Sequence, residues 1–273
     1  MRQAAALLCL FLLCGCGKED DAWLGYAEGD NAFVAAPQAG WVAHMRVRRG
    51  DAVKVGDILF ALDDTSQTSA RDQAVATIAM TEGQMREAEA NLVLTQKELV
   101  RQSGLLRANA GTGQNYDIAK SNYEQAVARI KQMNAQEAQA RATLANARYL
   151  LSERDVVSKT AGRIEDVYFR TGEYAPAMTP VVSILPPQNV YVRFFVPETE
   201  FAKIKLGQRV SISCDGCQQG LTATIAFIAQ QEEFTPPVIF SNGSREKLVF
   251  KVEARAPGGL RLNPGQPVRV RPL

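Results

Sequence analysis

The 273-residue sequence predicts an α+β fold, in which a long antiparallel α-helical coiled-coil hairpin is inserted into a split β domain and followed by a small β-barrel. Three observations carry this prediction. A central proline-free stretch is rich in helix formers, a hydrophobic pattern is repeated on either side of it, and short apolar runs separated by turn residues follow. With 46% hydrophobic and 22% charged residues, the composition is that of a folded protein with two or three small domains.

The hairpin is predicted over residues 65–155, within a segment that has no proline from Gln38 to Ala175. Two heptad patterns run through it and predict helices at about 66–103 and 114–153, each about 57–60 Å long. A glycine cluster between them, Gly104, Gly111 and Gly113, predicts the turn. An intermolecular coiled coil or a helical bundle is the alternative. The seam positions of the second helix are Tyr116, Ala119, Tyr123, Ala126, Ile130, Met133, Glu137, Ala140, Leu144, Ala147 and Leu151.

A short pattern occurs twice, once on each side of the hairpin. Gly40 is followed ten residues later by Gly50, and Gly162 is followed ten residues later by Gly172. The hydrophobic residues around both copies also match at an offset of 122 residues, as expected for a duplicated unit. We therefore predict that residues 36–64 and 156–185 form one β domain and that the helices are an insertion into it.

Residues 36–60 resemble the first half of the split biotinyl/lipoyl-type domain of HlyD-type periplasmic adaptors, also called membrane fusion proteins, and 156–185 resemble the second half. The resemblance implies an adaptor of a tripartite efflux or secretion system, which links an inner-membrane transporter to a TolC-like outer-membrane channel. It also implies a ring of copies, expected to be a hexamer. The helical insertion replaces the junction at which biotin and lipoate carriers hold their modified lysine, so no cofactor and no catalytic activity are expected.

The predicted hairpin tip resembles the Arg-Leu-Ser pattern of adaptors that bind TolC-like channels. The matching residues are Arg101, Leu105 and Thr112, with threonine in place of the family's serine. Arg101 and Leu105 are one helical turn apart and project from one face, where arginine can form two hydrogen bonds to an acceptor. The resemblance implies that these residues dock on the channel. The alternative is that Leu105 packs in the seam and Arg101 is a solvated charge.

The N-terminus resembles a bacterial lipoprotein signal. A basic residue, a short apolar run and small residues precede Cys16, so residues 1–15 are predicted to be cleaved and Cys16 to be acylated. Residues 16–35 are then an anchor and linker. An ordinary secretory signal with incidental cysteines is the alternative. We expect a periplasmic protein held on a membrane by lipid, the inner membrane being favoured, although Gly17 gives no clear retention signal.

Residues 186–273 contain short strand-like runs and turn residues that predict the β-barrel domain. Cys214 and Cys217 flank an Asp-Gly turn, and in an exported protein a disulfide is the leading interpretation, with a zinc site a poor alternative. This pair and residues 234–241 resemble the adaptors that work with ABC-type exporters. A proton-driven RND-type partner remains the alternative, and a biotin or lipoate carrier subunit and a structural envelope lipoprotein are more distant ones.

The charge balance and histidine content argue against several classes of function. With 31 basic and 29 acidic residues, the net charge of +2 gives no electrostatic basis for nucleic-acid binding. His44 is the single histidine, which disfavours a histidine-based metal site and a Ser/His/Asp triad. We expect His44 to be structural, and Trp23 and Trp41 to be packing residues of the β domain.

Overall fold

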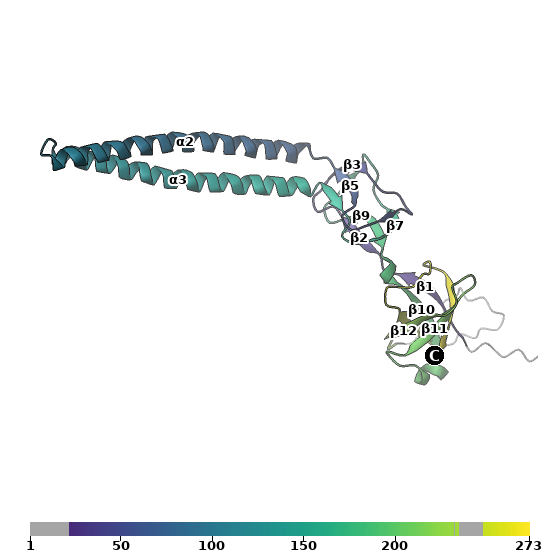
Figure 1. Ribbon diagram of the computed structural model, residues 1–273. Helices are drawn as coiled ribbons and strands as arrows, with labels where there is room; N and C mark the ends of the chain where they lie inside the picture. The colour runs from purple at the N-terminus through teal and green to yellow at the C-terminus, as the bar shows by residue number, and fades with distance from the viewer. Residues whose placement is uncertain (1–21, 232, 235–247) are drawn as a thin grey trace, which may run out of the picture. The chain divides into compact units, whose positions relative to one another are not determined.

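The computed structural model describes residues 22–231, 233–234 and 248–273, so Cys16 and most of the 234–241 segment lie outside the described residues. The chain forms two compact units. One contains residues 33–159 and 166–182, and the other contains the residues before 33 together with 160–165 and those from 183 onward (Figure 1). Within the described part of the chain, no helix has the length and hydrophobicity needed to cross a membrane.

The first unit contains the predicted hairpin, made of α2 (Thr65–Arg107) and α3 (Gly113–Ser152), which run antiparallel side by side (Figure 1). Asp63 precedes α2, and its carboxylate accepts a hydrogen bond from the Thr65 amide, which holds the pKa of Asp63 below its usual value. The predicted end of the first helix at residue 103 is wrong. α2 continues through Gly104 for one more turn, because a single glycine weakens a helix without stopping it.

The seam between α2 and α3 is lined by small residues, as the heptads predict. Thr81 and Ala88 are buried on α2, and Met133 is fully buried on α3. Small seam residues let the two helices approach closely, so the hairpin has a thin core, and the buried positions of α2 lie between Ala74 and Ala88. The buried residues of α3 are Ala119, Ala126, Met133, Ala140, Leu144 and Ala147.

The split β domain is built from strands that precede and follow the hairpin. Two cross-strand pairs join residues on either side of the hairpin: Phe60 pairs with Val156, and Trp41 pairs with Tyr174. The helical hairpin is therefore an insertion into one β domain, as predicted. One sheet has the order β6 (Asp155–Val157), β5 (Ile58–Leu62), β3 (Gly40–Met45) and β8 (Tyr174–Ala175); the second has β2 (Ala32–Ala35), β9 (Pro180–Leu185), β7 (Gly162–Val167) and β4 (Ala52–Val53).

The second unit is a six-stranded antiparallel barrel, which confirms the predicted C-terminal architecture. Its order is β10 (Val190–Pro197), β1 (Trp23–Gly29), β15 (Pro267–Pro272), β11 (Arg209–Ser213), β12 (Leu221–Ile228) and β14 (Leu248–Arg255). Pairing of β14 with β10 closes the barrel, and the short β13 (Glu233–Phe234) adds to β14. Two short 3-10 helices, η1 (Pro187–Asn189) and η2 (Glu198–Lys203), flank β10.

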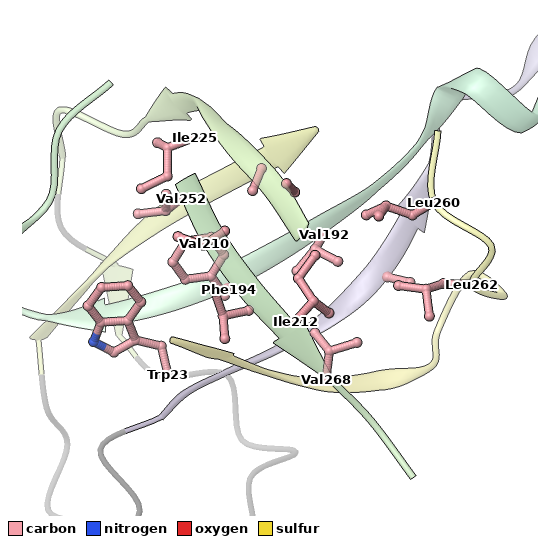
Figure 2. Close-up of a cluster of buried hydrophobic side chains, with 14 of the residues drawn as sticks. Trp23, Val192, Phe194, Val210, Ile212, Ile225, Val252, Leu260, Leu262 and Val268 are labelled. Atoms are coloured by element: carbon pink, nitrogen blue, oxygen red, sulfur yellow. The ribbon is translucent and has the colours of Figure 1, made fainter. Parts of the chain in front are cut away.

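The first strand of this barrel corrects two expectations. Residues 16–35 were expected to be a linker, but β1 (Trp23–Gly29) pairs on both sides within the barrel. Trp23 is 5% exposed, stacks on Phe194 at 5.6 Å between ring centroids, and lies in the barrel core (Figure 2). Trp41 is not a core residue, since its side chain is exposed and meets Tyr174 edge-on. The alternation of a single strand at the N-terminus is too short a signal to assign it to a distant domain.

A polar network on the barrel ties β1 to two neighbouring strands. Arg193 on β10 donates to Glu28 on β1 at 2.6 Å and to Glu253 on β14 at 2.9 Å. Tyr191 donates its hydroxyl to Glu28 at 2.8 Å, and burial together with this bond raises the pKa of Tyr191. The tyrosine and the arginine therefore keep their protons over the physiological pH range, and the network persists there.

One turn design recurs in both units. Each of these turns has four residues, and the third is a glycine with φ between +81° and +92°. The side chain of the fourth residue accepts a hydrogen bond from the backbone N–H of the first residue at 2.7–3.1 Å. The glycine is required because other residues rarely adopt that φ. The sequence predicts the glycine turns but not the side-chain bond that closes them. The turns are Arg48–Asp51, Lys54–Asp57, Arg170–Glu173, Lys205–Gln208 and Asn263–Gln266.

Candidate docking site at the hairpin tip

The end of α2 is shaped by an asparagine and not by the predicted glycines. Asn109 adopts a left-handed conformation with φ +56°. Its amide donates to the Leu106 carbonyl at 3.1 Å, and the Ala110 amide donates to the Leu105 carbonyl at 2.9 Å. These two bonds are those of a Schellman motif, which satisfies the last carbonyls of a helix. Asparagine is the usual alternative to glycine at this position, so Asn109 was itself a sequence signal for the end of the helix. It was overlooked because the nearby glycines were sufficient to explain the turn.

The start of α3 explains two further tip residues. Gly111 lies so close to α2 that a Cβ there would be 3.1 Å from the Cβ of Leu105. Thr112 is the N-cap of α3, and its side-chain oxygen accepts from the Asn115 amide at 3.2 Å. The loop between the helices is therefore held in a defined conformation by the Schellman motif at the end of α2, the close packing of Gly111 against α2 and the Thr112 cap of α3.

All three predicted docking residues are exposed at this tip. The Arg101 side chain is 68% exposed and is paired with Glu98, one turn earlier on the same helix. Leu105 is 38% exposed, whereas Leu106, seven residues after Leu99, takes the seam position on α2 and is less exposed. The Thr112 oxygen is used as an acceptor by the cap, which leaves its hydroxyl hydrogen available to a partner. The three side chains offer charge, an apolar contact and a donor.

We expect Thr112→Ala to lower the stability of the tip by about 1 kcal/mol, because the N-cap bond is lost. Thr112→Ser should keep the cap, and Thr112→Val should lose it while preserving side-chain volume. Hydrogen exchange at the Asn115 amide is the direct measurement, since this amide donates to the Thr112 side chain. Equal protection of this amide in the wild type and in both the alanine and valine variants would argue against the cap.

The structure joins Cys214 to Cys217 by a disulfide across a turn, with the Cα atoms 5.3 Å apart. The Gln266 side-chain amide lies against both sulfurs, at 3.5 Å from Cys214 and 3.3 Å from Cys217. No group of three or more His, Cys, Asp and Glu side chains able to hold a metal ion is found among the described residues.

We expect mature exported protein to show no reactive thiol at Cys214 or Cys217 until it is reduced. The reason is that an oxidising compartment favours the bridge. Because the closed loop is short, reduction should change global stability little. Thiol alkylation and mass measurement under denaturing, non-reducing conditions provide the test, and two alkylated cysteines at these positions would exclude the disulfide.

The hairpin and the barrel define an adaptor-type architecture, and comparisons with known proteins agree. A family model described as "RND MFP, alpha-helical hairpin domain" matches residues 77–153. The crystal structure of MacA from Actinobacillus actinomycetemcomitans superposes with a TM-score of 0.70 at 18% identity, covering 92% of this chain and 78% of that one. At this level of identity the structural likeness concerns the fold.

Sequence relatives extend the match beyond the hairpin. The colistin resistance protein EmrA of Acinetobacter baumannii is 25% identical over 308 residues, covering 92% of this chain and 86% of the relative. An uncharacterized protein of Haemophilus influenzae is 25% identical over 184 residues, or 67% of this chain, which spans only 41% of that protein's length. The chain is therefore similar to the membrane fusion proteins, also called periplasmic adaptors, in its hairpin and over most of its length.

Proposed function

We propose that the protein is the adaptor subunit of a tripartite efflux or secretion system, linking an inner-membrane transporter to a TolC-like outer-membrane channel. The observation that supports this best is the paired rod of α2 and α3, inserted into a β domain. Helices of 43 and 40 residues extend about 60–65 Å at 1.5 Å per residue, which suits a bridging arm. Its work is then geometric, and we expect no catalytic activity.

The class of transporter has two candidates. The Cys214–Cys217 pair and the 234–241 segment resemble adaptors of ABC-type exporters, which makes that class our first proposal. The second is a proton-driven RND-type pump, which is favoured by the description of the family model that matches residues 77–153. Identification of the transporter that co-purifies with the protein distinguishes the two.

We propose further that the mature protein is anchored by acylated Cys16 in the periplasm, with the inner membrane favoured. Radiolabelled palmitate should enter the wild type and not a Cys16→Ala variant, because acylation requires this cysteine. Burial of acyl chains contributes about 0.8 kcal/mol per CH₂, enough for several chains to hold a protein without a spanning helix. Equal labelling of both proteins, or no labelling of the wild type, would contradict the proposal.

Purification of the complex tests the proposed function as a whole. A C-terminally tagged chain, isolated from membranes of its own host after mild cross-linking, should bring down one transporter and one outer-membrane channel. Deletion of the gene should make cells sensitive to the exported compound or abolish secretion. Recovery of neither partner, together with unchanged export in the deletion strain, would leave a structural envelope role as the better explanation.

A further inference from the structure

Every large apolar side chain that is exposed on the described part of the second unit lies at or near one end of its barrel. The other large apolar side chains of the barrel strands pack in the core (Figure 2). Single exposed apolar residues need no explanation, but a group gathered at one place indicates an interaction surface. The exposed residues, at 37–67% exposure, are Leu24, Leu206, Phe227, Leu248 and Leu273.

The strand registers place these residues at the end of the barrel where β1 begins. Trp23 pairs with Val270, so β1 begins where β15 ends. β11 is antiparallel to β15 and β12 is antiparallel to β11, so β11 begins and β12 ends at the same place. β14 begins there as well, since it is antiparallel to β12. Leu206 precedes β11, Phe227 is close to the end of β12, and Leu248 is the first residue of β14. We call this the Trp23 end of the barrel.

Basic residues flank Leu206 in the chain at the Trp23 end. Lys205 directly precedes it, Lys203 and Arg209 lie three residues before and after it, and all three are exposed. Apolar side chains with Lys and Arg beside them are typical of protein surfaces that bind the headgroup region of an anionic membrane. The chemistry of the Trp23 end therefore fits a lipid surface.

The charges of two of these basic residues are available to a partner. Glu200 in η2 lies 3.8 Å from the ammonium group of Lys203 and offsets part of its charge, and Glu198 in η2 is exposed. Neither Lys205 nor Arg209 forms an ion pair with other residues that the structure describes. Complementary charge on a partner surface would therefore be met by Lys205 and Arg209.

The proposed lipid anchor leads to this end of the barrel and not to the opposite one. Six residues separate Cys16 from Trp23. A fully extended chain spans at most about 3.6 Å per residue, so Trp23 can be no more than about 25 Å from an acylated Cys16. β1 then runs toward Gly29 at the opposite end, which is about 20 Å further along. The anchor therefore brings the Trp23 end close to the bilayer whether or not a transporter is bound.

We infer that the Trp23 end of the barrel binds directly to the anionic surface of the membrane that holds the anchor. Leu206 and Phe227 enter the headgroup region, while Lys205 and Arg209 lie at the level of the lipid phosphates. A weak contact of this kind suffices, because the anchor makes it intramolecular and raises the effective concentration of lipid. The inference rests on the proposed acylation and adds a second point of attachment, which fixes the direction of the barrel at the membrane.

Fluorescence quenching by lipid tests the contact in the absence of a transporter. The mature, acylated protein carrying Leu206→Trp is reconstituted into vesicles of phosphatidylethanolamine and phosphatidylglycerol, with or without bromine on the acyl chains. We expect brominated lipid to quench the added emission by about half, because the side chain reaches the boundary between headgroups and acyl chains. The matched control is Gln219→Trp, at an exposed position in the turn at the opposite end of the barrel, which should not be quenched. The wild type gives the background from Trp23 and Trp41.

Removal of one positive charge tests the electrostatic part of the contact. In the Leu206→Trp background, Lys205→Gln should lower the ratio of docked to undocked protein by about fivefold, the usual effect of one lysine near an anionic surface. Lys54→Gln removes the same charge from an exposed position in the other unit and should have no effect. Vesicles of phosphatidylcholine alone, which carry no net charge, should also weaken docking. Equal quenching with and without Lys205, and with and without anionic lipid, would overturn the contact with anionic lipid.

Flotation of the vesicles separates this inference from the proposed function. If the protein floats with the vesicles but Leu206→Trp is not quenched, the anchor stands and the lipid-binding surface is wrong. If the protein does not float, the proposed acylation fails and the inference falls with it. If the emission of Leu206→Trp is already that of a buried indole without vesicles, another part of the chain, such as 235–247, covers this end, and the inference is overturned.

Photo-cross-linking in cells that contain the full export system distinguishes lipid from a protein partner. A photoreactive benzoylphenylalanine in place of Leu206 should form adducts with lipid. An adduct with the inner-membrane transporter in place of the lipid adduct would assign this surface to the transporter and overturn the inference, while leaving the adaptor role intact.

Discussion

Replacement of Arg101 by aspartate is expected to abolish cross-linking to the outer-membrane channel and to abolish export, while the fold is retained. The substitution removes a cation that can form two hydrogen bonds to a carboxylate or a carbonyl, and puts a repelling charge in its place. The cost to the hairpin should be small, since Arg101 is 68% exposed and its ion pair with Glu98 lies on the surface of the same helix. Cross-linking from the tip and an export assay measure the effect.

Two variants control this experiment. Arg101→Lys keeps the charge but loses the planar fork, so partial export is expected. Arg141→Asp makes the same charge change at a second exposed arginine, which pairs with Glu137 on α3 and lies far from the tip along the hairpin. This variant should keep channel cross-linking. Full export by Arg101→Asp, with unchanged channel cross-linking, would show that Arg101 is only a solvated charge.

The parts of the fold that could be predicted from the sequence are those with long, regular patterns. The heptad series from Tyr116 to Leu151 and its companions identified the buried face of α3, because the period of the pattern is repeated many times. The repeated Gly-containing pattern predicted that residues on both sides of the hairpin share one β domain, which the pairing of Phe60 with Val156 confirms. Both signals accumulate over tens of residues.

The features that could not be predicted depend on short signals or on contacts distant in sequence. The strand beginning at Trp23 belongs to the barrel because of its partners near residues 194 and 270, and seven residues cannot indicate such distant partners. Trp41 is a large aromatic residue of the kind expected in a core, but it lies on the outer face of a sheet beside Tyr174. A register shift of one residue moves every side chain of a strand to the opposite face of the sheet. Alternation over only a few residues does not show which face is buried.

At the hairpin tip, too, some residues could be assigned a role from the sequence and others could not. Arg101 and Leu105 were identified by their resemblance to the Arg-Leu-Ser pattern of channel-binding adaptors, and both are exposed. The structural role of Thr112 as the α3 cap was not anticipated, although a threonine before a helix is a known start signal. A hydroxyl at this position therefore has a reason to be present that is independent of the channel. Thr112→Asp separates the docking role of Thr112 from capping, because a carboxylate can accept the N-cap bond but has no hydroxyl hydrogen to donate.

Replacement of Trp23 by alanine is expected to destabilise the barrel by about 3–5 kcal/mol, the usual cost of removing a buried aromatic side chain. Trp23 is 5% exposed, stacks on Phe194, and donates its indole N–H to Glu200 at 2.6 Å. These contacts join the first barrel strand to β10 and to η2. The substitution should loosen β1 more than the hairpin, because the helices lie in the other compact unit. Hydrogen exchange, resolved by strand, measures this difference.

Trp23→Phe is the milder change at the same position. Phenylalanine keeps a ring against Phe194 but is smaller and cannot donate to Glu200, so its cost should be at least that of a bond to a charged acceptor, about 1.5 kcal/mol, and below that of alanine. If β1 is the connection between a lipid anchor at Cys16 and the barrel, Trp23→Ala should also impair export while palmitate labelling is unchanged. Wild-type exchange rates throughout β1 in Trp23→Ala would mean that the Arg193 network to Glu28 holds this strand without the tryptophan.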